Sequence, residues 1–214
     1  MHQDSNSRPR PDHISRYKAL FFAVLLVPFL TSGDDQPNRL EQTLQRGSIT
    51  MLTRNGASSY FLGAEGETGP EYELVREFAD FIGVDLDVNV ADAFGQLGQL
   101  LNEGEGDLIA ANLTRTPSRE ARFSFGPVYQ ETRTELVYRR GQTRPRSFAD
   151  LGGISLAVIA GSSYEEMLKV AAEDHPGLEW STVENAGMED MLLAVSEGEI
   201  DATLVDSNIL AINK

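Results

Sequence analysis

The sequence contains no cysteine among its 214 residues. A chain without cysteine forms no disulfide, offers no thiol nucleophile and holds no thiolate-bound metal. Histidine is scarce as well, because His2 and His13 lie in a polar head segment and leave only His175 beyond it. We therefore expect no histidine-based metal site, no catalytic triad and no cofactor.

Positive charge is also in short supply. The chain has 18 lysines and arginines against 33 aspartates and glutamates, a formal net charge of −15, and most of the acids follow residue 46. Such a chain is repelled by a phosphate backbone, so nucleic acid is not an expected partner. The length suits one domain of two lobes, or two small domains.

The first segment has the pattern of an export signal. Basic residues (Arg8, Arg10, Arg16 and Lys18) precede an apolar run at residues 19–30, and small residues follow at 31–33. The run is too short for a membrane span of about 20 residues and matches a secretory signal. We predict a signal peptide or, as the alternative, an uncleaved anchor at residues 1–33, export to the periplasm, and a polar linker at 34–46.

The remaining chain repeats one order of elements. Its first half is predicted to contain strands at 48–53, 84–90 and 108–111, with helices at 71–82 and 94–101 between them. Its second half is predicted to contain strands at 154–159, 178–183 and 202–205, with helices at 165–172 and 188–195. A β-α-β-α-β unit written twice predicts two α/β lobes with mainly parallel sheets.

The segment between the repeats predicts a connection. We place the first lobe at 47–132, an extended crossover or hinge at 133–147, and the second lobe at 148–214. The crossover contains a β-prone stretch at 134–138 and four arginines, Arg139, Arg140, Arg144 and Arg146. These arginines either contact an anionic polymer or a membrane, or simply keep a connector solvated.

Residues 113–120 (LTRTPSRE) form the corner around which the first lobe is organised. They follow a buried strand and begin a helix, because Thr116 suits the N-cap and Pro117 the first helical position. Arg119 then lies in the first turn, where its guanidinium can hold a carboxylate together with hydroxyls and free N–H groups. The alternative is a capped helix whose arginine forms a surface ion pair.

Ligands of open α/β sheets bind outside the carboxyl ends of the strands. The candidates that follow strands here are Arg54, Asn55, Tyr60, Asn112, Thr114, Arg119, Gly161, Ser162, Ser163 and Asp206. Together they suit a zwitterion, with Arg119 for a carboxylate and Asp206 for an ammonium group. Each has a structural alternative: Ser162 and Ser163 as N-caps, Asp206 as a turn residue, and Tyr60 as part of the core.

The chain resembles the family 3 periplasmic solute-binding proteins at these residues. The stretch 69–79 (GPEYELVREFA) is similar to their first-helix pattern, and Thr114-x-Thr116-x-x-Arg119 to their ligand-binding turn. The resemblance implies a two-lobed type 2 fold in which Arg119 grips an amino-acid α-carboxylate beside Thr114. It also implies a helix start at Gly161, Ser162 and Ser163 that contacts the ligand, and Asp206 as the partner of the amino group.

Three stretches are more similar to one branch, the solute-binding-like domain of the membrane-bound lytic murein transglycosylases F. These stretches are 53–63, 136–141 and 206–209. The resemblance implies a parent enzyme at the bacterial outer membrane that cleaves murein, with this domain sensing an amino acid or a murein peptide. The glutamate–serine pair that carries the branch's catalytic glutamate does not occur in these 214 residues. We therefore expect no catalytic residue here and cannot assign enzymatic activity to this chain itself.

Two expectations about the chain as a whole remain. The second lobe and its return to the first lobe are expected to be incomplete, as in a fragment. The alternative function is a stand-alone periplasmic amino-acid-binding protein of an ABC transporter.

Overall fold

The structure is a computed structural model that describes residues 38–141 and 144–213. The predicted signal segment and the start of the predicted linker lie outside the described residues. Within the described part, no helix is both long enough and apolar enough to cross a membrane.

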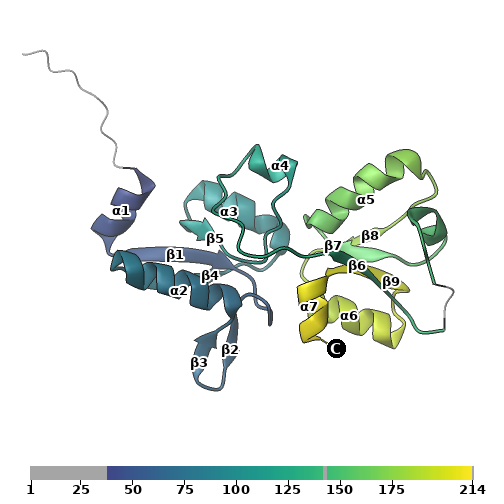
Figure 1. The fold of residues 1–214 in the computed structure, drawn as a ribbon, viewed down its shortest axis with the longest axis horizontal. Helices are drawn as coiled ribbons and strands as arrows, with labels where there is room; N and C mark the ends of the chain where they lie inside the picture. Colours follow the sequence, from purple (N-terminus) through teal and green to yellow (C-terminus); the bar gives the residue numbers. More distant parts are fainter. Residues whose placement is uncertain (1–37, 142–143, 214) are drawn as a thin grey trace, which may run out of the picture. The chain divides into compact units, whose positions relative to one another are not determined.

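The first lobe is built on a three-stranded parallel sheet with the order β4-β1-β5 (Figure 1). The strands are β1 (Ser48–Thr53), β4 (Asp85–Val90) and β5 (Leu108–Ile109). Helix α2 (Pro70–Ile82), the short helix η1 (Phe94–Gln96) and helix α3 (Leu97–Glu103) connect them. Met51 and Leu52 of β1 are fully buried, so the central strand supplies the core on both faces of the sheet.

The second lobe has the same arrangement. Its strands are β7 (Ala157–Ile159), β8 (Ser181–Val183) and β9 (Ala202–Asp206). Its helices are η2 (Phe148–Leu151), α5 (Ser163–Asp174), α6 (Met188–Glu197) and α7 (Ser207–Ile212). β7 pairs in parallel with β8 and touches β9 through a parallel bridge between Leu156 and Ala202.

The predicted repeat is confirmed by this topology. In each lobe the first strand of the unit lies between the second and the third. The mixed α/β fold with two similar lobes follows from this order. Because parallel strands end at one edge of the sheet, the loops after β1, β5, β7 and β9 can converge on one site.

Strands β7 and β8 begin three residues later than predicted, and other parts of the chain also differ from the sequence expectation. The last eight residues of the predicted linker form helix α1 (Arg39–Arg46), which begins with a capping box between Asn38 and Glu41. The glycine-rich loop after β1 forms a hairpin of β2 (Phe61–Gly63) and β3 (Gly66–Thr68). Hydrophobic periodicity does not predict either element, because neither buries a long apolar face.

The predicted crossover also contains a regular element. Residues Thr134–Tyr138 form β6, which pairs antiparallel with β9 and so joins the sheet of the second lobe. The sheet is therefore mixed, and the described part of the predicted connection contributes a strand to it. Of the predicted arginine cluster, Arg139 pairs with Asp201 at 3.6 Å.

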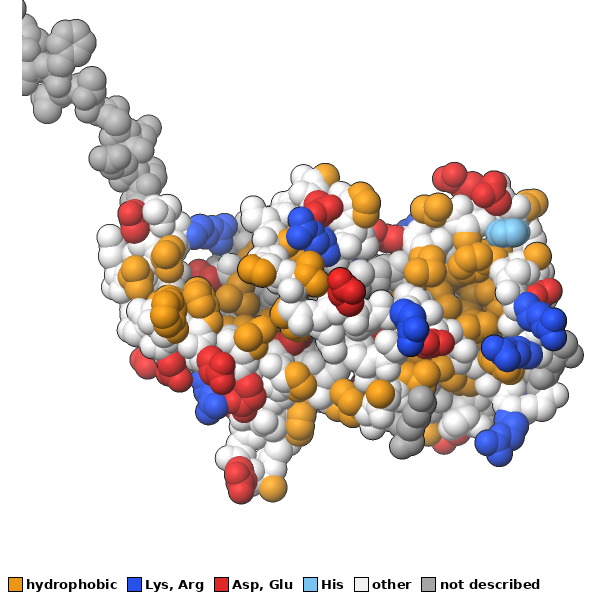
Figure 2. All heavy atoms as spheres, in the orientation of Figure 1, with side chains coloured by type: hydrophobic (Ala, Val, Ile, Leu, Met, Phe, Trp, Pro, Cys, Tyr) orange, Lys and Arg blue, Asp and Glu red, His pale blue; other side chains and the backbone are white. Residues whose placement is uncertain are grey.

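Charged side chains of both signs are distributed over the face shown in Figure 2. Apolar side chains gather over α1 and α2 on this face (Figure 2), where Leu40, Leu44, Leu74, Phe78 and Phe81 are exposed.

Candidate functional site

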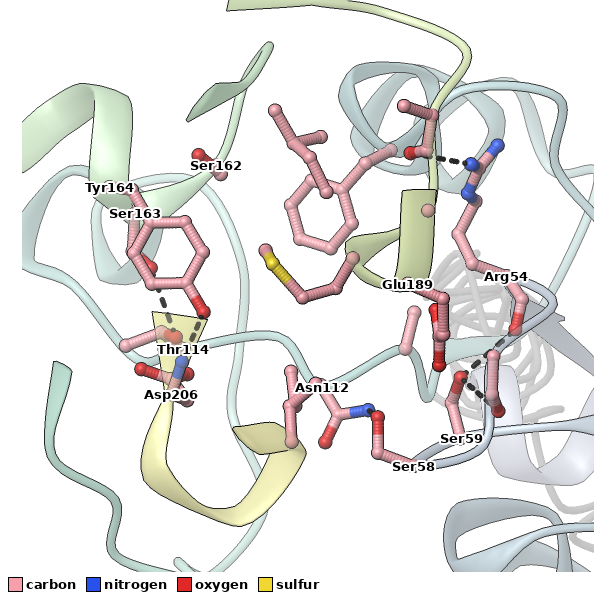
Figure 3. Close-up of a pocket in the computed structure, with 18 of the residues that line it drawn as sticks. Arg54, Ser58, Ser59, Asn112, Thr114, Ser162, Ser163, Tyr164, Glu189 and Asp206 are labelled. Carbon is pink, nitrogen blue, oxygen red and sulfur yellow. Dashed lines mark hydrogen bonds between the residues drawn. The ribbon is translucent and has the colours of Figure 1, made fainter. Parts of the chain in front are cut away.

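A cavity of about 80 Å³ lies where segments of both lobes meet. A single water needs roughly 10–15 Å³ by the same measure, so there is room for several water-sized groups. Figure 3 shows side chains from the β1 and β5 loops facing side chains from α5, α6 and β9. Predicted site residues in the lining are Arg54, Asn55, Asn112, Thr114, Ser162, Ser163 and Asp206.

Asp206 is the buried acid of the cavity, with 8% of its surface exposed. Its backbone N–H donates to the hydroxyl of Tyr164 at 2.9 Å, and the Thr134 hydroxyl donates to its carboxylate at 3.4 Å. Burial raises the pKa of this carboxyl above its ordinary value, although neighbouring hydroxyls oppose the shift. No lysine or arginine of the described residues forms an ion pair with it. Asp206 is therefore a buried carboxyl group that an incoming cation would stabilise in its charged form.

The start of α5 closes the cavity from the second lobe. Ser162 is the N-cap, and its hydroxyl accepts the N–H of Glu165 at 3.3 Å, as its structural alternative predicted. Ser163 instead reaches across the lobes, with its hydroxyl 3.2 Å from that of Thr114 (Figure 3). The two predicted serines thus have different roles, and Ser163 joins the two walls.

Asn112 is held in a left-handed backbone conformation, with φ at 53°. Its N–H donates to the Glu71 carboxylate at 2.7 Å, and its side-chain amide donates to the Ser58 hydroxyl at 2.8 Å. Glu71 is buried and also accepts the Tyr129 hydroxyl, and burial raises its pKa. Glu71 therefore fixes the turn that brings the Asn112 amide to the cavity.

Arg54 links the lobes through backbone carbonyls. Its Nη1 donates to the carbonyls of Ala91, at 3.0 Å, and of Asp92. Its Nη2 donates to the carbonyl of Ala186 on the second lobe, at 3.2 Å (Figure 3). The guanidinium thus points away from the cavity centre, and its hydrogen bonds fix the backbone segments that form the cavity wall.

Tyr60 does not line this cavity. It packs in the core against Met51 and Val75 with 7% of its surface exposed, and its hydroxyl donates to Glu67 at 2.8 Å. The structural alternative for Tyr60 therefore describes its position in this structure.

Arg119 and Gly161 also lie outside the cavity lining. The Arg119 guanidinium donates to the carbonyls of Thr114, at 2.8 Å, and Gly161, at 2.9 Å. It lies 3.5 Å from the Glu166 carboxylate and packs over the ring of Phe94, which does line the cavity. Burial lowers the pKa of Arg119 from its ordinary value. Arg119 therefore does not form the surface ion pair of the alternative interpretation. In this arrangement it is also not open to the cavity, and its contact with a ligand carboxylate stays a prediction.

Sequence reasoning missed several lining residues: Ser58, Ser59, Phe94, Tyr164, Met188, Glu189 and Ile209. Glu189 could have been found, because it lies at the start of α6, just after the second strand of the second lobe. The strand-end rule applied to that strand points to it. The apolar residues carry no such signal, since their pattern is that of any helix core.

Comparisons with known proteins support the fold. Residues 49–148 match the model of the bacterial extracellular solute-binding proteins, family 3. The fold is shared with solved amino-acid-binding proteins. An ancestral arginine-binding protein bound to arginine superposes with a TM-score of 0.70 and 24% identity, over 78% of this chain and 74% of that chain. A substrate-binding protein of a Streptococcus pneumoniae ABC uptake transporter, with bound histidine, gives a TM-score of 0.71 and 21% identity, over 85% and 73%.

Several similar sequences belong to proteins named membrane-bound lytic murein transglycosylase F. The membrane-bound lytic murein transglycosylase F of Pseudomonas savastanoi pv. phaseolicola is 39% identical over 206 residues, which are 96% of this chain and 42% of that protein. Its counterpart in Aeromonas salmonicida is 39% identical over 194 residues, 90% of this chain and 39% of that protein. The chain thus spans about two fifths of the length of these relatives.

Proposed function

We propose that this chain is the ligand-sensing, solute-binding-like part of an exported murein transglycosylase. Two observations support the proposal: similarity to such enzymes over nearly the whole chain, and a cavity between two α/β lobes of the amino-acid-binding fold. The ligand class is an amino acid or a murein peptide. The protein would lie in the periplasm and associate with the membrane or the cell wall.

The main support for this ligand class is the carboxylate of Asp206. A buried carboxyl that lacks a cationic partner among the described residues is costly to ionise, and a ligand ammonium would remove that cost. The hydroxyls of Thr114 and Ser163 and the amide of Asn112 supply donors for a ligand carboxylate. In this arrangement Arg119 does not line the cavity, and it holds the start of α5 through the Gly161 carbonyl.

Ligand binding would favour contact between the lobes. Hydrogen bonds already cross them from Arg54 to Ala186, from Ser163 to Thr114 and from Arg119 to Gly161. A ligand that touches both walls adds to these contacts and shifts the population toward the closed arrangement. A change of this kind is what a sensing domain can pass to a neighbouring domain.

The test is calorimetric titration of the full chain with free amino acids and with murein peptides. Asp206→Asn is expected to weaken binding by about 1.5–3 kcal/mol, the scale of a hydrogen bond to a charged group. Asp80→Asn, at an exposed position of α2, is the matched control and should bind as the wild type does. Equal affinities of the wild type and Asp206→Asn would remove Asp206 from the site.

A second candidate is a stand-alone amino-acid-binding protein of a transporter. The superposition on the S. pneumoniae transporter protein favours it. The two candidates differ in their ligands: a transporter protein should prefer a free amino acid, whereas a cell-wall sensor should prefer the murein peptide.

A further inference from the structure

The cavity contains a second carboxylate, that of Glu189, which the proposed zwitterion site does not use. Glu189 lies in the first turn of α6. Figure 3 shows it on the opposite side of the cavity from Asp206. One carboxylate is enough for a ligand ammonium group, so the second needs an explanation of its own.

The charge of Glu189 is not balanced by an ion pair. Its carboxylate accepts one N–H bond, from Ala57 of the first lobe at 3.2 Å. No lysine or arginine among the described residues lies within ion-pair distance of it. The cation that shares the lining is Arg54, whose guanidinium is bound to three backbone carbonyls. A ligand cation would therefore meet a carboxylate at each side of the cavity.

The remaining lining suits the chain between two such cations. Phe94, Ile159, Met188 and Ile209 contribute apolar surface to the same cavity. Methylene groups packed there lose contact with water, while charged ends remain beside carboxylates. A neutral side chain would fill the apolar part and leave Glu189 without a cationic partner.

We propose that Glu189 selects ligands that carry two cationic groups, an ammonium at Asp206 and a second ammonium or guanidinium at Glu189. This proposal rests on the proposed function and names the ligand class more narrowly: a basic amino acid, or a short peptide with a free amino end and a basic side chain. Glu189 is the specificity-determining residue, and Asp206 binds ligands of either kind.

The test compares ligand pairs that differ in one charge. Lysine and norleucine differ at the side-chain terminus, where lysine carries an ammonium group, and the dipeptides alanyl-lysine and alanyl-norleucine repeat the comparison at peptide length. Calorimetry on the full chain should show at least one lysine ligand binding about tenfold or more tightly than its norleucine partner, the lower end of the range for a charged hydrogen bond.

Two variants separate charge from structure. Glu189→Gln keeps an oxygen that can accept the Ala57 N–H but removes the charge, so it should abolish the lysine preference and leave norleucine binding unchanged. Glu189→Ala removes both, and should weaken all ligands if the bond to Ala57 also holds the lobes together. Glu197→Gln, an exposed position on the same helix, is the matched control and should retain the wild-type preference.

The outcomes are distinct. Equal binding of lysine and norleucine ligands to the wild type would overturn the role of Glu189 while leaving an amino-acid site in place. Equal weakening of both by Glu189→Gln would assign the residue a structural role and overturn the proposal as well. If no ligand of either pair binds, and the amino acids and murein peptides of the first titration also fail, the proposed function itself is wrong and the proposal falls with it.

Discussion

The guanidinium of Arg119 donates a hydrogen bond to the carbonyl of Gly161, 2.9 Å away on the other lobe. The same group donates to Thr114 within its own lobe and lies beside the Glu166 carboxylate. Arg119 therefore holds the turn at residues 113–120 of the first lobe against the helix start of the second. An arginine that sequence reasoning assigns to a ligand acts, in this arrangement, as a contact between lobes.

Arg119→Ala should lower the free energy of unfolding by about 1.5–3 kcal/mol, because two partly buried backbone carbonyls lose a charged donor. Urea denaturation measures this change. The matched control is Arg115→Ala, which removes an exposed arginine paired with Glu120 and should cost less than about 1 kcal/mol. If Arg119→Ala and Arg115→Ala lower the free energy of unfolding by the same small amount, the contacts of Arg119 stabilise the protein no more than a surface ion pair does.

Gly161→Ala should disturb the contact between the lobes, in addition to straining the backbone at this position. Gly161 has φ at 72°, and an added Cβ would lie 2.9 Å from the Cα of Gly95 on the first lobe. The left-handed conformation alone costs a non-glycine residue about 1–2 kcal/mol. We expect a further loss, seen as a lower melting temperature and a larger radius of gyration in solution scattering.

Gly153→Ala is the control for that experiment. Gly153 has a similar φ of 79°, but nothing lies within 4 Å of an added Cβ. Gly153→Ala should strain the backbone without a steric clash. Its melting temperature should therefore fall while its radius of gyration stays the same. Identical behaviour of the two variants would mean that the lobes do not approach each other at Gly161 in solution.

Glu71 should make stability fall as pH rises. Burial raises its pKa in the folded protein, so the folded state binds its proton more tightly than the unfolded state does. The stability that the protonated carboxyl contributes is fully present below its unfolded pKa of about 4.3 and is lost as pH rises through the higher folded pKa. Glu71→Gln does not titrate, so its free energy of unfolding should fall less between about pH 4 and pH 7.

The measurement is urea denaturation of both proteins at several pH values across that window. Glu77→Gln, at an exposed position of the same helix, is the control and should keep the wild-type profile. A wild-type profile that runs parallel to that of Glu71→Gln would show that Glu71 titrates alike in the folded and unfolded states.

The sequence predicted the strands most securely where burial and chain order agree. β1 begins and ends at the predicted residues, 48 and 53, because its short, mostly buried run is bounded by Gly47 and by the polar loop after it. Helix α1 and the β2–β3 hairpin were missed, because they are polar elements whose hydrogen bonds, rather than an apolar face, define them.

Several residues that line the cavity were predicted by the same reasoning. Arg54, Asn112, Thr114, Ser163 and Asp206 all follow strands, and strand order alone brings them to the carboxyl edge of each sheet. What sequence could not decide is where each side chain points. Tyr60 and Arg119 also follow strands, yet one packs into the core and the other bonds to backbone carbonyls.

The sequence by itself determined the repeated β-α-β-α-β order, the capped helix starts and the residues available at the strand ends. These depend on local periodicity and on the backbone chemistry of a few neighbouring residues. Only the tertiary structure decided that Glu189 shares a cavity with Asp206 and that Arg119 reaches Gly161. Those contacts join residues far apart in the chain, and they depend on how the two lobes pack against each other.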